Sequence, residues 1–119
     1  MFWKKKKKFI ESDFEFLLDY GFSRKKYVRP PDIEFVFVRD GLEIEIDYYL
    51  GVLESYEEVM CFCVIITKDN KRNNLLQCTD IFGADLIKKL TADIQNLDAG
   101  AQMPIYAQFL KDNIEILIK

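Results

Sequence analysis

Two extended runs that meet at Asp40-Gly41 constrain the fold of this chain more than any other feature. Residues 33–39 and 42–49 are rich in β-branched and aromatic side chains, and Asp-Gly tolerates the positive φ angles of a tight hairpin turn. The second run alternates strictly: apolar side chains share one face, and the other face carries Glu43, Glu45, Asp47 and Tyr49. A slip of one residue would bury the carboxylates. The sequence therefore predicts a hairpin with one acidic face.

The charge of the chain is unevenly distributed. Its 119 residues fit a single domain, 1–119, and half of them are hydrophobic, enough for a compact core. Five of the 17 basic residues are Lys4 to Lys8, so we expect residues 1–8 to be a loose basic terminus. The remaining 12 basic and 20 acidic residues give residues 9–119 a net charge of −8. Such a body repels nucleic acid and attracts a basic protein.

The first half of the chain predicts one helix and several strands. Residues 9–20 have the apolar spacing of an amphipathic helix that ends at Gly21. Residues 26–29 predict a short edge strand before two prolines. Residues 59–67 are apolar on both faces and predict a central strand that is covered on two sides. Residues 68–74 are polar and predict a turn or loop.

The second half predicts two helices. Apolar residues at i, i+3 and i+4 define the first, closed by Gly100: Leu86, Ile87, Leu90, Ile94 and Leu97. The second begins near Met103-Pro104 and is either one helix or two helical pieces. Residues 75–82 fit a short strand or a helical turn equally well. The predicted fold class is α+β, with an N-terminal helix, a three- to four-stranded antiparallel sheet and two C-terminal helices packed on one face.

The absence of histidine excludes most hydrolase and zinc-enzyme arrangements, because no triad, Cys-His dyad or imidazole ligand can form. The cysteines are Cys61, Cys63 and Cys78, and this odd number indicates reduced, buried thiols. The glycines form no phosphate-binding loop, and no zinc-ribbon, helix-turn-helix or RNP motif is present. We therefore expect no catalytic residue, no cofactor and no metal.

The carboxylate row Glu43, Glu45 and Asp47 has several interpretations. It can be a solvated face, a surface for a basic protein, a hard-cation site or a source of acid and base for glycoside cleavage. Calcium sites favour loop and backbone oxygens, and glycosidases need carboxylates that face each other across a cleft. The three tyrosines nearby fit either a binding hot spot or the solvent edge of a core: Tyr48, Tyr49 and Tyr56.

Besides the acidic hairpin, the chain contains two patterns of core and turn residues: Phe14-x-x-Leu17-Leu18-x-x-Gly21-Phe22, and Tyr106-Ala107-x-Phe109-Leu110-x-x-Asn113. Together with the hairpin, they resemble small bacterial α+β immunity proteins of polymorphic toxin systems. The resemblance implies a protein that binds and blocks a cognate toxin and has no catalysis of its own. These families diverge so widely that the resemblance transfers no binding residue to this chain.

The sequence thus predicts a non-enzymatic, cytoplasmic protein-binding module. Glu43, Glu45 and Asp47 would dock the positive charge of a basic toxin domain, and Tyr49 would supply contact area. One alternative is a small-ligand-binding or enzymatic domain with a pocket between the sheet and the C-terminal helices. Another is a structural subunit that pairs through its sheet edge. We expect no nucleic-acid partner and no stable membrane association, since no apolar window approaches a membrane span. The oligomeric state and the identity of the partner stay open.

Overall fold

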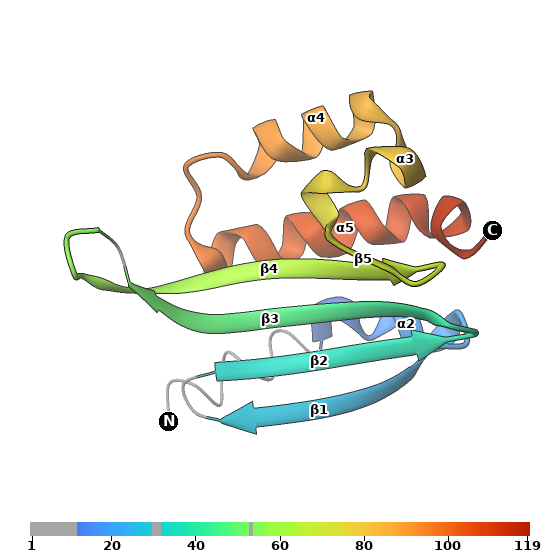
Figure 1. Ribbon diagram of the computed structural model, residues 1–119, viewed down its shortest axis with the longest axis horizontal. Coiled ribbons are helices and arrows are strands. Elements are labelled where there is room, and N and C mark those ends of the chain that lie inside the picture. The colour runs from blue at the N-terminus through green and yellow to red at the C-terminus, as the bar shows by residue number, and fades with distance from the viewer. Residues whose placement is uncertain (1–11, 30–31, 53) are drawn as a thin grey trace.

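Five strands form one antiparallel sheet, in which each strand pairs with the next one along the chain (Figure 1). The computed structural model describes residues 12–29, 32–52 and 54–119. The strands are β1 (Ser23–Arg29), β2 (Asp32–Arg39), β3 (Leu42–Val52), β4 (Glu58–Lys68) and β5 (Lys71–Asn74). The α+β class is confirmed, and the predicted count of three to four strands is corrected to five. Of the helix predicted over residues 9–20, residues 12–14 and 16–19 are helical, and residues 9–11 lie outside the described residues. The basic terminus predicted at residues 1–8 lies wholly outside them.

Two tight turns explain the register of the sheet. Asp40 and Gly41 have φ angles of 47° and 80°, and Arg39 pairs with Leu42 across the turn as predicted. A second turn of the same kind joins β4 to β5, where Asp69 and Asn70 have φ angles of 53° and 65°. The prediction of a turn or loop over residues 68–74 is therefore right for the turn at residues 69–70 and wrong for residues 71–74, which form β5. It missed β5 because a four-residue polar strand shows no hydrophobic alternation.

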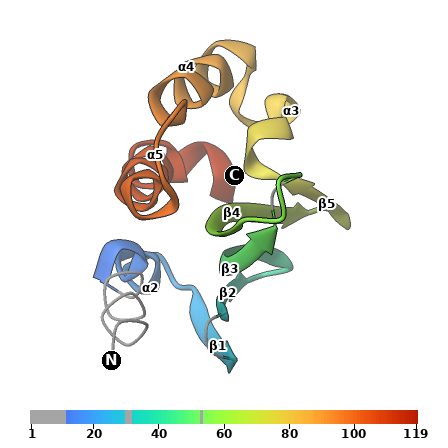
Figure 2. The same cartoon turned by 90° about the vertical axis from the view of Figure 1, so that its left-hand side faces the viewer.

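The helices lie on one side of the sheet. They are α2 (Phe16–Asp19), α3 (Thr79–Phe82), α4 (Ala84–Ile94) and α5 (Ala99–Ile118), with a 3₁₀ turn at Leu75–Gln77. Figure 2 shows α2 and α5 against the same face of the sheet, with α4 on the far side of α5. The prediction of two C-terminal helices packed on one face is therefore corrected in part: α3, α4 and α5 all follow the sheet, α5 contacts it and α4 packs on α5. Residues 75–82 form helical turns.

Alternate side chains of β2, β3 and β4 meet α2 and α5 in the core. The Phe62 ring stacks near Phe14 at a centroid distance of 6.2 Å and meets the Tyr106 ring edge-on at 5.3 Å. Phe14 and Leu17 are fully buried, as the helical spacing predicted. Each such side chain stabilises the fold by about 1.5–3 kcal/mol relative to an exposed one, so this single core holds the helices to the sheet.

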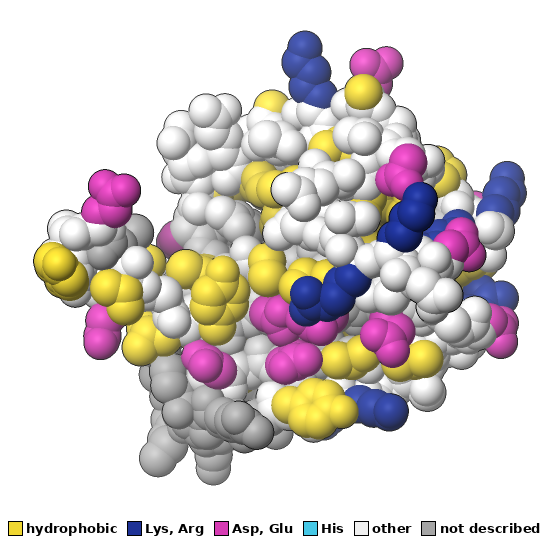
Figure 3. Space-filling view, in the orientation of Figure 1, with side chains coloured by type: hydrophobic (Ala, Val, Ile, Leu, Met, Phe, Trp, Pro, Cys, Tyr) yellow, Lys and Arg dark blue, Asp and Glu magenta, His cyan; other side chains and the backbone are white. Residues whose placement is uncertain are grey.

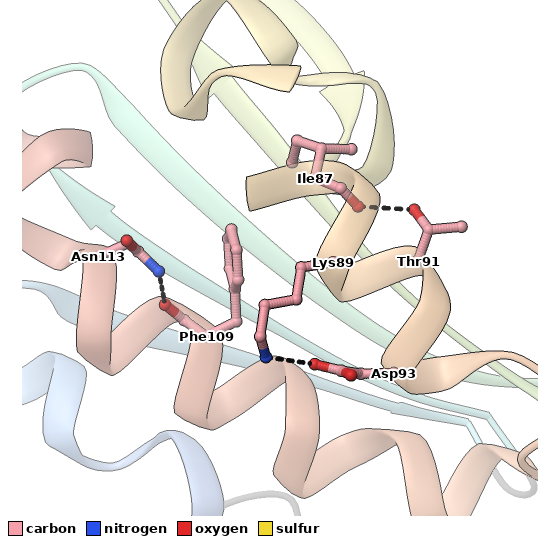
Figure 4. A network of polar contacts seen from close by, with 6 residues as sticks. All are labelled: Ile87, Lys89, Thr91, Asp93, Phe109 and Asn113. Atoms are coloured by element: carbon pink, nitrogen blue, oxygen red, sulfur yellow. Dashed lines mark hydrogen bonds and ion pairs between the residues drawn. The ribbon is translucent and has the colours of Figure 1, made fainter. Parts of the chain in front are cut away.

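Helix α5 begins earlier than predicted and bends near its end. Asp98 caps it, because its Oδ1 accepts a hydrogen bond of 2.8 Å from the Ala101 amide. Pro104 therefore lies inside the helix, where it removes one backbone donor. Asn113 leaves helical geometry (φ −120°, ψ 15°), which matches the alternative of two helical pieces. Its Nδ2 donates to the Phe109 carbonyl at 2.8 Å, and the Phe109 side chain points toward α4 (Figure 4).

Candidate functional site

The side of the sheet opposite α2 and α5 is the candidate site, and we call it the open face. In the part of the chain that the structure describes, no helix lies across β2 and β3 on this side (Figure 2). Strand alternation directs every second side chain to it. The pairing register sets three cross-strand rows side by side: Glu34, Asp47 and Cys63; Val36, Glu45 and Ile65; Val38, Glu43 and Thr67.

The four residues predicted to bind a partner all lie on the open face. Glu43 is exposed, and Tyr49 keeps 39% of its surface exposed. Glu45 and Asp47 are half-buried, which a solvated strand would not show. Figure 3 shows the carboxylates in a band across the middle of this face, bordered by hydrophobic side chains. Register places these residues together, and their role in binding stays a prediction.

Glu34 joins the predicted row from the neighbouring strand. It stands opposite Asp47, and one oxygen each of Glu34, Glu45 and Asp47 lie within 4.8 Å of one another. Sequence reasoning did not select Glu34, because its strand carries valines at the next two outward positions. The Asp40-Gly41 turn was the signal that could have found it, since the turn fixes which residues of β2 and β3 stand opposite each other.

Asp47 holds its proton unusually tightly. Burial raises the pKa of Asp47 to about 8, and the hydrogen-bonded, negatively charged Glu45 and then Glu34 add to the effect. At neutral pH, Asp47 is therefore mostly protonated and donates to Glu45. The open face carries less negative charge than its composition suggests, and the missing charge returns when the pH rises or when a cation approaches.

β5 and β4 supply the other polar contacts of the cluster. Arg72 Nη2 lies 3.1 Å from Glu45 Oε2, so the missed fifth strand places a cation on the open face. Cys63 Sγ donates a weak hydrogen bond to Asp47 Oδ2 at 3.8 Å. Burial, followed by the charge of Asp47, raises the pKa of the Cys63 thiol to about 12. This thiol is therefore a poor nucleophile at neutral pH.

The cysteines depart in part from their prediction. None of the three is in a disulfide, and Cys78 is buried. Cys61 and Cys63 are only half-buried, because they point to the open face rather than into the core. Ile65 follows them on the same side of β4 and is also half-buried. The expectation of a central strand covered on two sides was therefore wrong: β4 is buried on the helix side alone, and its outer side contributes apolar surface to the open face.

The chemistry available at the cluster is limited. Glu34, Glu45 and Asp47 could together hold a hard cation, but each offers one oxygen from a straight strand, whereas calcium takes six to eight oxygens. Side-by-side carboxylates on a sheet do not flank a substrate as glycosidase carboxylates do. A cavity of about 240 Å³ lies where β4 and β5 meet α3 and α5, the place of the alternative ligand pocket. Contact with a positively charged surface is the simplest use of the open face.

Comparison of the chain with protein-family models, curated proteins and solved structures finds no significant match. Within the described residues, no helix combines the length and the apolar character needed to cross a lipid bilayer.

Proposed function

We propose that this chain is a non-catalytic protein-binding module that engages a basic protein through the open face. The main support for the proposal is the cross-strand row Val36, Glu45 and Ile65 in the middle of the open face. In this row two apolar side chains flank a carboxylate, and all three side chains are half-buried. Protein interfaces combine such an apolar centre with aromatic anchors and satisfied polar groups. The charge of −8 over residues 9–119 would steer a basic partner toward this surface.

The four predicted residues would act in two ways. Glu43 is exposed, so its charge would act mainly on the association rate and would be screened by salt. Glu45 and Asp47 are half-buried, and a partner would desolvate them further, so they would act mainly on dissociation. Tyr49 supplies amphipathic contact area beside them.

The resemblance to immunity proteins makes a basic toxin domain the specific partner we propose. Binding would neutralise the toxin by covering its positive surface. Two features support a role without catalysis: the chain has no histidine, and the half-buried thiol beside the carboxylates is held in its protonated form. The same features make the open face suited to contact rather than to turnover.

The test uses isosteric variants, because reversing the charge of half-buried Glu45 and Asp47 would also disturb the fold. Partners are captured from an extract of cells that make the protein and identified by mass spectrometry, and their affinity is then measured with purified components. The triple variant Glu43→Gln, Glu45→Gln, Asp47→Asn should bind the partner at least about tenfold more weakly, since a close charge pair in an interface contributes about 1.5 kcal/mol or more to the binding free energy. Its control, with the same change in formal charge, is Asp80→Asn, Asp85→Asn, Glu115→Gln, whose residues are exposed on helices. Equal affinities for the two variants would contradict the proposal.

A further inference from the structure

A hollow of about 400 Å³ opens on the open face where β1, β2 and β3 run side by side. Five of the residues that line it have side chains on this face by the pairing register: Tyr27, Asp32, Glu34, Asp47 and Tyr49. It therefore combines two aromatic rings with three carboxyl groups.

The register explains how these groups surround the hollow. Tyr27, Glu34 and Asp47 stand opposite one another on three consecutive strands, and Asp32 and Tyr49 belong to the next row. Neighbouring strands are about 4.8 Å apart, so the two tyrosines stand on strands about 10 Å apart, with carboxylates between them. Tyr27 and Tyr49 are 52% and 39% exposed, which leaves ring surface free for contact. The Leu50 amide holds Asp32 in place by donating to Oδ1 at 2.9 Å.

Among the residues whose side chains the structure describes, the hollow carries negative charge only, and the pairing register also sets Arg29 opposite Asp32. The described residues that line it include no lysine or arginine. Among the described strand side chains, Lys25 and Arg72 are the cations on this face, and Arg72 is already paired with Glu45. A group with flat faces and a positive charge is what this combination of rings and carboxylates would recognise.

We propose that the hollow receives an arginine side chain of the protein partner, with its guanidinium between Tyr27 and Tyr49 and paired to the carboxylates beneath. The proposal rests on the proposed function and names its anchor. Arginine fits better than lysine because the guanidinium is planar, stacks on aromatic rings and forms bidentate pairs with carboxylates. The ammonium of lysine offers only a compact, strongly hydrated charge.

Binding of a guanidinium should be linked to the proton on Asp47. Because burial and the neighbouring carboxylates raise the pKa of Asp47 to about 8, an arriving cation would favour its ionised form and release a proton. Affinity should therefore rise with pH between about 6 and 9. The described titratable groups around Asp47 on the open face come from all five strands: Lys25, Tyr27, Asp32, Glu34, Glu45, Tyr49, Cys61, Cys63 and Arg72.

The first experiment uses small probes and the whole chain. Nα-acetyl-arginine methylamide is titrated while backbone amide NMR shifts are recorded, and the citrulline analogue, a neutral isostere, is the control. Shifts should be confined to the strand segments around the hollow, and citrulline should bind at least about tenfold more weakly because it lacks the charge. The lysine analogue should bind severalfold more weakly. Free arginine should also bind more weakly, because the carboxylates of the hollow repel its own carboxylate.

Matched variants locate the site. Tyr27→Leu and Tyr49→Leu should each weaken binding of the arginine probe severalfold, and Tyr56→Leu should leave it unchanged, since Tyr56 is 89% exposed and lies outside the hollow. Asp47→Asn should remove most of the pH dependence. The NMR spectrum of each variant shows directly that it is folded.

The outcomes separate this inference from the proposed function. Equal binding of arginine and citrulline, shifts elsewhere on the molecule, or an equal loss for Tyr56→Leu would overturn the arginine anchor. Tighter binding of free arginine would overturn it too, because it would indicate a site for a small molecule. A captured partner that loses affinity for the open-face carboxylate variants and keeps it for the tyrosine variants would overturn the anchor and the contact assigned to Tyr49. That result would leave the acidic open face as the binding surface. If the hollow binds the arginine probe while partner affinity does not depend on the open face, the proposed function is contradicted. The partner's arginine is then excluded as the occupant, and only the capacity of the hollow to bind a guanidinium remains.

Discussion

The two faces of the sheet are built from the same strands and differ in nearly every physical respect. On the helix side, Phe35, Ile46 and Val64 are all completely buried. On the open face, the residues next to them in sequence, Val36, Glu45 and Ile65, are half-buried, and no helix of the described residues lies above them. The helix side has the composition of a hydrophobic core, in which apolar side chains are fully buried. The open face has the composition of an interface, because apolar side chains and partly desolvated charges are left where only neighbouring side chains shield them.

The largest expected effect is a difference in folding stability between substitutions on the helix side and substitutions on the open face. Phe35→Ala should destabilise the fold by about 3–5 kcal/mol, because it leaves a cavity in the core. Val36→Ala, one residue along the same strand, should cost only about 1 kcal/mol, since its side chain is half-buried. Urea unfolding followed by circular dichroism measures both. Similar losses for the two variants would show that the open face is as tightly packed as the helix side.

The second effect is the pH dependence of the open face. The folded-state pKa of Asp47 is raised to about 8 from an ordinary value of 3.8, so the folded protein holds a proton that the unfolded chain has lost. This contribution is fully present below the ordinary value and is lost as the pH rises through 8. Between pH 6 and pH 9, stability should fall by about 1 kcal/mol, a figure reduced for solvent screening around a half-buried carboxyl.

Asp47→Asn supplies the control for that measurement. The amide keeps the shape and cannot ionise, so the free energy of unfolding of the variant should change less between pH 6 and pH 9 than that of the wild type. Wild-type stability that stays constant or rises over this range would mean that Asp47 is ionised in the folded protein.

The smallest effect concerns the ion pair that joins β3 to β5. The side chains of Glu45 and Arg72 are 21% and 61% exposed, so their 3.1 Å contact should stabilise the fold by about 0.5 kcal/mol. A double-mutant cycle with Glu45→Gln and Arg72→Met isolates this coupling. A coupling energy above about 2 kcal/mol would indicate that the pair behaves as a buried ion pair and that Arg72 is needed for the stability of the sheet.

The helix side was the easier half to predict. The alternation in residues 42–49 and the Asp40-Gly41 turn correctly gave the hairpin, its register and the shared face of Glu43, Glu45 and Asp47. The helical stripe through Ile87 and Leu90 likewise gave residues that are buried. These features depend on residues that are close together in the sequence, so the periodicity of apolar residues predicts them directly.

The open face was harder because it depends on pairing between strands. β5 lacks an apolar pattern, so Arg72 was not expected beside Glu45. The apolar outer side of β4 suggested a second covering layer, although Cys63 and Ile65 are shielded only by side chains of the same face. Periodicity shows which residues share a face, and it does not show what covers that face.

The most direct test of the central claim is a map of where the partner touches. The isotope-labelled protein is bound to its unlabelled partner, and cross-saturation NMR identifies the contacted amides. We expect a footprint on β1 to β4 that includes Glu45, Asp47 and Tyr49, with α4 and α5 unaffected. An alternative footprint is available in the hollow of about 470 Å³ between α4 and α5, which is lined by Leu86, Ile105 and Phe109 among others. Contacts confined to that hollow, with the open face untouched, would contradict the proposal that the open face binds the partner.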